Sequence, residues 1–383
     1  MIYLDYAATT PADPRVVRAM QAHLGPDGLF ANPSATSHAP GRQAAEAVER
    51  ARARVAALIG AREVLFTSGA TEANNLAVLG MARALRRRGR HVVTCASEHP
   101  SVLDACRALD REGFEVTVLA PDEGGRLAPE RLREALRPDT VLVSVMLANN
   151  ETGVVQDVAA LAELARGRGA VFHTDAVQAV GRMPVRVGDL GVDLLSFTAH
   201  KLYGPKGVGA LWIRDGLDPL PEPLMHGGGQ ERGLRPGTLP THQIVGFAEA
   251  CRIAAEEGPA EWARLAELTA RLEARLAAAG MTARNGDPAR AVPGILNMAF
   301  CGVDADVLLS LLEGVACASG AACHAGDVRG SHVLRAMGLA QWRVRGALRL
   351  SLGRYTTAEE VEEAAARITA LVARLRAGRR LAC

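Results

Sequence analysis

The chain has 383 residues, 49% of them hydrophobic and 22% charged, and its formal net charge is +2. This composition is ordinary for a globular protein, and the weak charge argues against nucleic acid or an anionic membrane as a partner. No apolar run is long enough to span a bilayer, and the early Asp5 with no basic n-region argues against a signal peptide. The seven cysteines are scattered and odd in number, which is typical of a cytoplasmic protein with free thiols.

Residues 1–40 are rich in proline and turn-forming polar residues, so we expect loops there. A helix is predicted from Arg42 to Ile59, where apolar residues share one face before Gly60. From residue 64 onward, short apolar runs alternate with helical patterns, which is typical of a parallel sheet covered on both faces. We predict strands at 64–66, 91–95, 115–119, 140–147, 170–174, 194–197 and 208–213, with helices ending near 88 and spanning 101–111, 129–136 and 158–166.

This alternation weakens after about residue 250. We predict a helix over 260–279, strands near 294–300 and 347–352, and a final amphipathic helix over 358–376. The sequence therefore predicts an α/β protein with a large domain over 15–255. Residues 1–14 and 256–383 are expected to form a smaller α+β domain.

The turn between the strands at 194–197 and 208–213 carries Lys201 and Lys206, the only lysines in the chain. Arginine supplies the other long basic positions, but it stays protonated and cannot form an imine. A desolvated lysine amine can condense with an aldehyde. We therefore expect an imine-forming lysine in this turn, the alternative being two surface lysines left over in an arginine-rich composition.

Three further segments follow predicted strands. Residues 68–71 open a helix, whose free N–H groups and dipole favour a phosphate, although a plain capped helix start is the alternative. Asp175 lies where ligands of parallel sheets bind; its carboxylate could hold a protonated ring nitrogen, or simply cap a helix. His99 could stack on an aromatic ring or transfer protons, or be an exposed cap residue.

Small residues and glycines surround Cys317 and Cys323, which suggests an accessible reactive thiol. A metal site with His324 and a buried structural thiol are the alternatives. The two cysteines are spaced more widely than usual zinc pairs and no second ligand pair lies nearby, so we predict no resident metal. A transient iron–sulfur cluster on Cys323 stays open.

Arg349 alternates with apolar residues in a predicted strand and therefore needs an anionic partner, either a substrate carboxylate or an internal salt bridge. An imine lysine, a ring-nitrogen aspartate, a phosphate cradle and a carboxylate-binding arginine are together the parts of a pyridoxal 5′-phosphate (PLP) enzyme. The alternative function outside the enzymes is a non-enzymatic sulfur carrier. The scarcity of lysine argues against that alternative.

Several motifs also carry a family resemblance that covers residues 1 to about 360. The sequence resembles the NifS/IscS-like cysteine desulfurases, which belong to the class V aminotransferase superfamily with the PLP-dependent fold type I. The motifs are YLDYAATT (3–10), FTSGATEANN (66–75), SEHPSVL (97–103), NNETGVVQD (149–157), HTDAVQ (173–178), SFTAHKLYGPKGVGAL (196–211), RPGTLPTHQIVG (235–246) and SGAACHAG (319–326).

The resemblance implies a large domain with a mostly parallel seven-stranded sheet, a homodimer, and L-cysteine as substrate. It also implies an iron–sulfur scaffold or another protein as sulfur acceptor. Lys201, Cys323 and His99 would be catalytic, with Lys201 as the Schiff-base lysine and Cys323 as the sulfur acceptor. The implied cofactor-binding residues are Ala70, Thr71, His99, Asn150, Asp175, Gln178, Thr198, His200, Lys201 and, reaching the neighbouring subunit, Thr238. The implied substrate-binding residues are Arg349 and Asn32.

The sequence departs from the family pattern after Cys323, where 324–330 reads HAGDVRG, and Ala321 stands where the family often has serine. Residues 321–324 also resemble the corresponding stretch of selenocysteine lyases. The predicted function is conversion of L-cysteine to L-alanine with a persulfide on Cys323, for iron–sulfur cluster or thio-cofactor synthesis. The alternative is a selenocysteine lyase.

Overall fold

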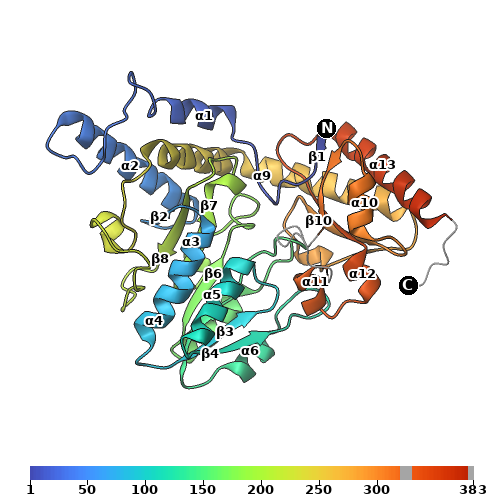
Figure 1. Cartoon of the computed structure of the whole chain (residues 1–383), viewed down its shortest axis with the longest axis horizontal. Coiled ribbons are helices and arrows are strands. Elements are labelled where there is room, and N and C mark those ends of the chain that lie inside the picture. Colours follow the sequence, from blue (N-terminus) through green and yellow to red (C-terminus); the bar gives the residue numbers. More distant parts are fainter. Residues whose placement is uncertain (320–329, 378–383) are drawn as a thin grey trace.

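The computed structural model describes residues 1–319 and 330–377, whose strands form a seven-stranded, a four-stranded and a two-stranded sheet (Figure 1). The seven-stranded sheet has the order β2-β8-β7-β6-β5-β3-β4. Its neighbours from β7 to β4 pair in parallel, and only β8 runs antiparallel to the strands on either side of it. The strands are β2 (Leu65–Thr67), β3 (His91–Cys95), β4 (Glu115–Leu119), β5 (Thr140–Ser144), β6 (Val171–Asp175), β7 (Leu194–Thr198) and β8 (Gly209–Ile213).

Helices cover both faces of this sheet. Alternate strand residues point to opposite faces, so Phe172 and Leu195 join one core while Val171 and Leu194 join the other. Helices α2, α6, α7 and the first half of α9 contribute to the first core, and α3, α4 and α5 to the second. The helices are α1 (Pro14–Gln21), α2 (Ala39–Leu58), α3 (Ala70–Asn75), α4 (Met81–Leu85), α5 (Pro100–Arg111), α6 (Pro129–Ala135), α7 (Val158–Gly167), α8 (Val187–Leu190) and α9 (Thr241–Ala277), with a π-helical turn at Leu76–Gly80 between α3 and α4.

The C-terminal part is built on the four-stranded antiparallel sheet β12-β13-β10-β9. Helices α10, α13 and the end of α9 pack on it in a separate hydrophobic core. A capping box between Thr357 and Glu360 begins α13. The elements are β9 (Thr282–Arg284), β10 (Ile295–Phe300), α10 (Ala305–Leu311), β11 (Val315–Ala316), β12 (Ala318–Ser319), α11 (His332–Ala336), α12 (Gln341–Arg345), β13 (Ala347–Ser351) and α13 (Ala358–Arg376).

The N-terminal segment belongs with this second sheet region although it is remote in sequence. Strand β1 (Ile2–Tyr3) pairs in parallel with β11, and Asp5 forms a bridge with Ser351 of β13. The following residues cross to the seven-stranded sheet, where the Thr10 N–H donates to the His200 carbonyl. The chain start therefore links the two sheets at the place where Lys201 lies.

The predicted seven-stranded, mostly parallel sheet is confirmed, and the predicted strands agree with the observed ones to within a few residues. The expectation of loops throughout 1–40 is wrong, because Asp13 caps α1 and Pro14 fits its first turn. The helix expected over 260–279 begins much earlier, at Thr241, and continues through Pro259. Within the described ranges, no helix combines the length and apolar character needed to cross a bilayer.

The separate cores support a division into two domains, and we propose the limits 15–255 for the large domain and 1–14 with 256–383 for the small one. Helix α9 crosses that boundary: its first half packs on α1 and α2, and its second half on α13 (Figure 1). Pro259 lies between the two halves.

Candidate active site

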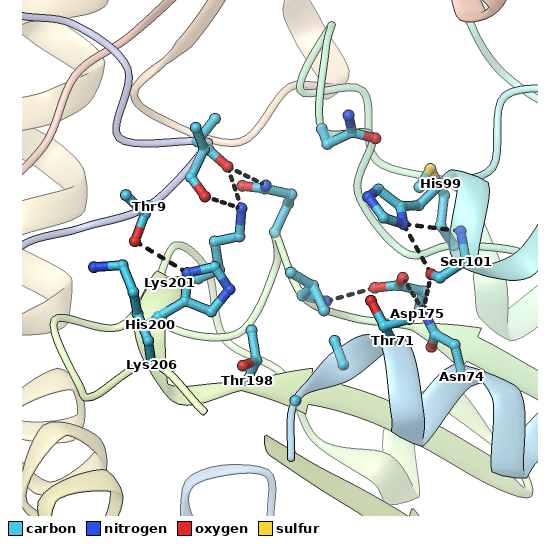
Figure 2. Close-up of a pocket in the computed structure, with 18 of the residues that line it drawn as sticks. Thr9, Thr71, Asn74, His99, Ser101, Asp175, Thr198, His200, Lys201 and Lys206 are labelled. Carbon is cyan, nitrogen blue, oxygen red and sulfur yellow. Dashed lines mark hydrogen bonds between the residues drawn. The ribbon is translucent and has the colours of Figure 1, made fainter. Parts of the chain in front are cut away.

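A cavity of about 680 Å³ lies beyond the carboxyl ends of β6 and β7, between the seven-stranded sheet and the N-terminal segment. Figure 2 shows Lys201 and His200 on one side of it, and His99, Ser101 and Asn74 gathered near Asp175 on the other. Ten of the residues named from the sequence line this cavity: Ala70, Thr71, His99, Asn150, Asp175, Gln178, Thr198, His200, Lys201 and Arg349.

Lys201 ends the short 3₁₀ turn that follows β7. Its Nζ donates hydrogen bonds to the carbonyl oxygens of Ala7 and Ala8, the second over 2.7 Å. The N-terminal segment thus holds the amine at the cavity wall. An amine placed there can react with an aldehyde inside the cavity.

Asp175 ends β6, and its side chain is buried. Its Oδ2 accepts from Asn74 Nδ2 at 2.7 Å, and its Oδ1 accepts from the Val177 N–H at 2.9 Å. These bonds fix the orientation of a carboxylate that lines the cavity. Such a carboxylate can stabilise a protonated ring nitrogen.

His99 caps the N-terminus of α5 with Nδ1, which accepts from the Ser101 N–H at 3.1 Å. Because Nδ1 is an acceptor there, the ring proton of neutral His99 resides on Nε2. Burial lowers the pKa of His99, with Lys201 acting in the same direction and Asp175 opposing it. The ring is therefore neutral at physiological pH and suited to stacking on an aromatic group.

The start of α3 forms a cradle at the lower end of the cavity in Figure 2, beside Thr198. Gly69 has φ of 153°, a backbone conformation that side chains disfavour. Gly209 on β8 makes the close approach possible, since a Cβ there would lie 2.7 Å from Gly69 backbone atoms. Burial, helped by the two nearby lysines, lowers the pKa of His200 to about 4, so its ring is neutral.

Three buried amide oxygens in the cavity wall have no hydrogen-bond partner within the described part of the chain: Asn74 Oδ1, Asn150 Oδ1 and Gln178 Oε1. Buried polar atoms are normally paired, so unpaired ones in one cavity indicate a polar group that binds there. Together with the amine of Lys201, the carboxylate of Asp175 and the cradle at Gly69, they fit PLP: an aldehyde, a ring nitrogen, a ring hydroxyl and a phosphate.

Arg349 reaches the cavity from β13 in the other sheet, and only 4% of its surface is exposed. Its Nη2 donates to Asp5 Oδ1 at 2.8 Å and its Nη1 to the Asn150 carbonyl at 3.2 Å. The internal salt bridge considered from the sequence is therefore present. This salt bridge lies in the cavity wall, where the guanidinium of Arg349 can also bind a ligand.

Three other predicted site residues are placed differently. Asn32 lines a separate surface cavity formed by residues between 28 and 43, and its Oδ1 accepts from the Ser34 N–H. Thr238 does not line the central cavity of this single chain. Cys323 lies outside the described residues. Their roles stay predictions.

Sequence reasoning missed Asn74, Ser101, Asp5 and the carbonyl groups of Ala7 and Ala8. Asn74 and Ser101 belong to quoted motifs, but their contacts need the packing of α3 against α5. Among the cysteines, Cys95, Cys106 and Cys251 are buried free thiols, whereas Cys301 is disulfide-bonded, so the expectation of free thiols is wrong for it. Burial raises the pKa of Cys317 to about 12, which keeps it protonated.

Comparisons with known proteins agree with this geometry. The family model Aminotransferase class-V matches residues 2–363. The chain is 50% identical to a protein named cysteine desulfurase IscS from Pectobacterium atrosepticum, over 98% of this chain and 93% of that protein. It is 48% identical to its namesake from Escherichia coli O9:H4, with the same coverage.

Solved structures are similar as well. A NifS-like protein superposes with a TM-score of 0.90 at 35% identity, covering 97% of this chain and 99% of that one. DndA from Streptomyces lividans superposes with a TM-score of 0.77 at 41% identity, covering 92% and 99%. The chain therefore belongs to the NifS/IscS-like cysteine desulfurases of the class V aminotransferase family.

Proposed function

We propose that this protein converts L-cysteine to L-alanine and transfers the sulfur to Cys323 as a persulfide. The observation that carries the proposal is the meeting of three groups in one cavity: the amine of Lys201, the carboxylate of Asp175 and the guanidinium of Arg349. Similarity to proteins named cysteine desulfurase over almost the whole chain supports the same reaction.

The cofactor of this family is PLP, which when bound supplies an electron sink for negative charge that develops on the substrate Cα. Asp175 would hold the ring nitrogen in its protonated form. Ala70, Thr71, Thr198 and His200 would hold the phosphate at the start of α3, where backbone N–H groups are free. His99 would cover one face of the ring, Gln178 would bond the ring hydroxyl, and Asn150 would line the ring site.

The substrate would be held by its carboxylate at Arg349, since a guanidinium can bind a carboxylate with two hydrogen bonds. Lys201 Nζ would hold the cofactor at its aldehyde group, and as a free amine it would take the proton from the substrate Cα. A single group thus serves as anchor and as general base, which requires a flexible amine rather than a guanidinium.

The sulfur step belongs to Cys323. Its thiolate would attack the substrate sulfur, forming an S–S bond while the Cβ–S bond breaks. The electron pair left on carbon takes up a proton, which gives alanine and leaves the sulfur as a persulfide. Because only the thiolate is nucleophilic, Cys323 must lose its proton near the site.

The proposal includes a homodimer in which Thr238 reaches the phosphate of the neighbouring subunit and Asn32 lies near the substrate. The protein that accepts the sulfur from Cys323 would be an iron–sulfur scaffold or another sulfur-accepting protein. The enzyme would act in the cytoplasm.

The test is a stoichiometry. Purified holoenzyme is incubated with L-cysteine and a reductant, and alanine and sulfide are quantified together; equal amounts are expected. Cys323→Ser should stop sulfide release while the visible absorbance of bound cofactor persists, and the matched variant Cys317→Ser should keep the activity. A Cys323→Ser protein that desulfurates at the wild-type rate would refute the assignment. Turnover of selenocysteine but not cysteine would favour the lyase.

A further inference from the structure

The partner of Arg349 is itself a carboxylate of this chain. Asp5 Oδ1 accepts from Arg349 Nη2 at 2.8 Å, and both residues line the central cavity. We propose that Asp5 is a specificity-determining residue whose carboxylate occupies the guanidinium until substrate binds and then competes with the substrate carboxylate. This inference rests on the proposed role of Arg349 in holding the substrate.

Backbone contacts fix Asp5 in this place. Ser351 lies two residues beyond Arg349 on β13, and its N–H donates to the Leu4 carbonyl at 2.7 Å. The Tyr6 N–H in turn donates to the Ser351 carbonyl at 3.2 Å. Because Asp5 lies between Leu4 and Tyr6, these backbone bonds fix its position beside Arg349. The contact therefore differs from one between two flexible surface side chains.

The donors of Arg349 are only partly used. Nη2 bonds to Asp5 and Nη1 to the Asn150 carbonyl, while Nε is buried with no partner among the described residues. A carboxylate binds a guanidinium best through two parallel N–H groups. Nη2 carries two N–H groups, so a ligand carboxylate bound by Nε and Nη2 shares Nη2 with Asp5 and lies next to the Asp5 carboxylate.

The charges make this a competition. The side chains of Arg349 and Asp5 are 5% and 22% exposed, so solvent screens their attraction only weakly. The pair is formally neutral, and a ligand carboxylate adds a second negative charge next to the same guanidinium. Like charges at this separation oppose each other, so Asp5 lowers the affinity for every ligand that uses Arg349.

Ligands without a carboxylate should not be affected by Asp5. L-alanine and ethylamine form a matched pair of probes, because they differ only in the carboxylate and both carry an amine that can react at the cofactor. The holoenzyme is titrated with each, and the change in visible absorbance of the bound cofactor gives the dissociation constant.

Asp5→Asn should tighten L-alanine binding about tenfold or more, because it removes the negative charge that opposes the ligand carboxylate, and should leave ethylamine binding unchanged. Asp5→Ser, which also removes the charge, should show the same selectivity if the amide of asparagine disturbs folding. Asp304→Asn, at an ion pair with Arg345 remote from the cavity, is the control and should alter neither probe.

Unchanged or weaker L-alanine binding in both Asp5 variants would overturn the inference, and so would an equal shift for ethylamine. Arg349→Gln separates this failure from that of the proposed function. If Arg349→Gln weakens L-alanine and the Asp5 variants do nothing, only the role of Asp5 is wrong. If Arg349→Gln leaves L-alanine binding unchanged, the substrate role of Arg349 is wrong and the inference falls with it.

Discussion

A buried ion pair holds the glycine-rich segment that leads to Thr238. Arg52 on α2 donates to both carboxylate oxygens of Glu231, over 2.7 and 2.8 Å, and the two side chains are 10% and 2% exposed. Glu231 also accepts from the Phe66 N–H at 2.7 Å. Burial alone would lower the pKa of Arg52, but Glu231 and, more weakly, Glu49 raise it overall, so the guanidinium stays charged.

Replacing Arg52 with alanine leaves the Glu231 carboxylate buried without its cation. Removing one partner of a buried pair costs about 3–5 kcal/mol, which is a large fraction of the stability of a typical protein. The matched control is Arg50→Ala on the same helix. Arg50 is 69% exposed and lies 3.6 Å from Glu46, so its loss should cost at most about 0.5 kcal/mol.

The measurement is urea unfolding of both variants followed by tryptophan fluorescence, with the shift in midpoint multiplied by the slope of the transition. We expect Arg52→Ala to lose about 3–5 kcal/mol with an unchanged slope. If Arg52→Ala and Arg50→Ala shift the midpoint equally, burial does not control the strength of these pairs and the reasoning fails.

Two further predictions concern the imine lysine and a buried histidine. Borohydride reduction of the holoenzyme should join the cofactor covalently to the peptide containing Lys201 and leave Lys206 unmodified; mass spectrometry that finds the label on Lys206 would contradict the assignment. Burial lowers the pKa of His173 to about 3 from a usual 6.5. Below pH 6.5 the unfolded chain therefore takes up a proton at His173 that the folded chain does not, so the stability present above pH 6.5 is lost as the pH falls toward 3. Between pH 6.5 and 4.5 the wild type should lose about 2.5 kcal/mol more than His173→Gln in urea unfolding, and equal losses would show that His173 does not titrate in this way.

The sequence was most informative for strands and site residues that can be identified from the residues next to them in the chain. Asp175 was found by the rule that ligands bind at the carboxyl ends of parallel strands, and Lys201 by the scarcity of lysine, and both line one cavity. The strands could be predicted because each is a short apolar run between turn residues. Helix α1 also had a local signal, because Asp13-Pro14 is typical of a helix start. The other prolines of this segment led instead to the prediction of loops.

Contacts between remote segments were not predictable in this way. Asp5 meets Arg349 across 344 positions of sequence, and no local pattern marks either residue as the other's partner. The start of α9 was missed for a related reason: Gly258-Pro259 indicates a break, but the packing of α9 on α2 before it and on α13 after it maintains the helix. Tertiary packing overrode the local propensity in that case.

The pairing of β1 with β11 sets an order of events during synthesis. Val315, the partner of Ile2, leaves the ribosome about 300 residues later, which takes about 15–60 s at ordinary elongation rates. In the later part of that interval the seven-stranded sheet can fold, because the last of its strands in sequence ends at Ile213. The strand pairing that precedes Ala7 and Ala8, whose carbonyl groups accept from Lys201, can form only after β11 has emerged. A nascent chain should therefore expose its reactive lysine to free aldehydes, including its own cofactor, before the wall of the cavity is complete.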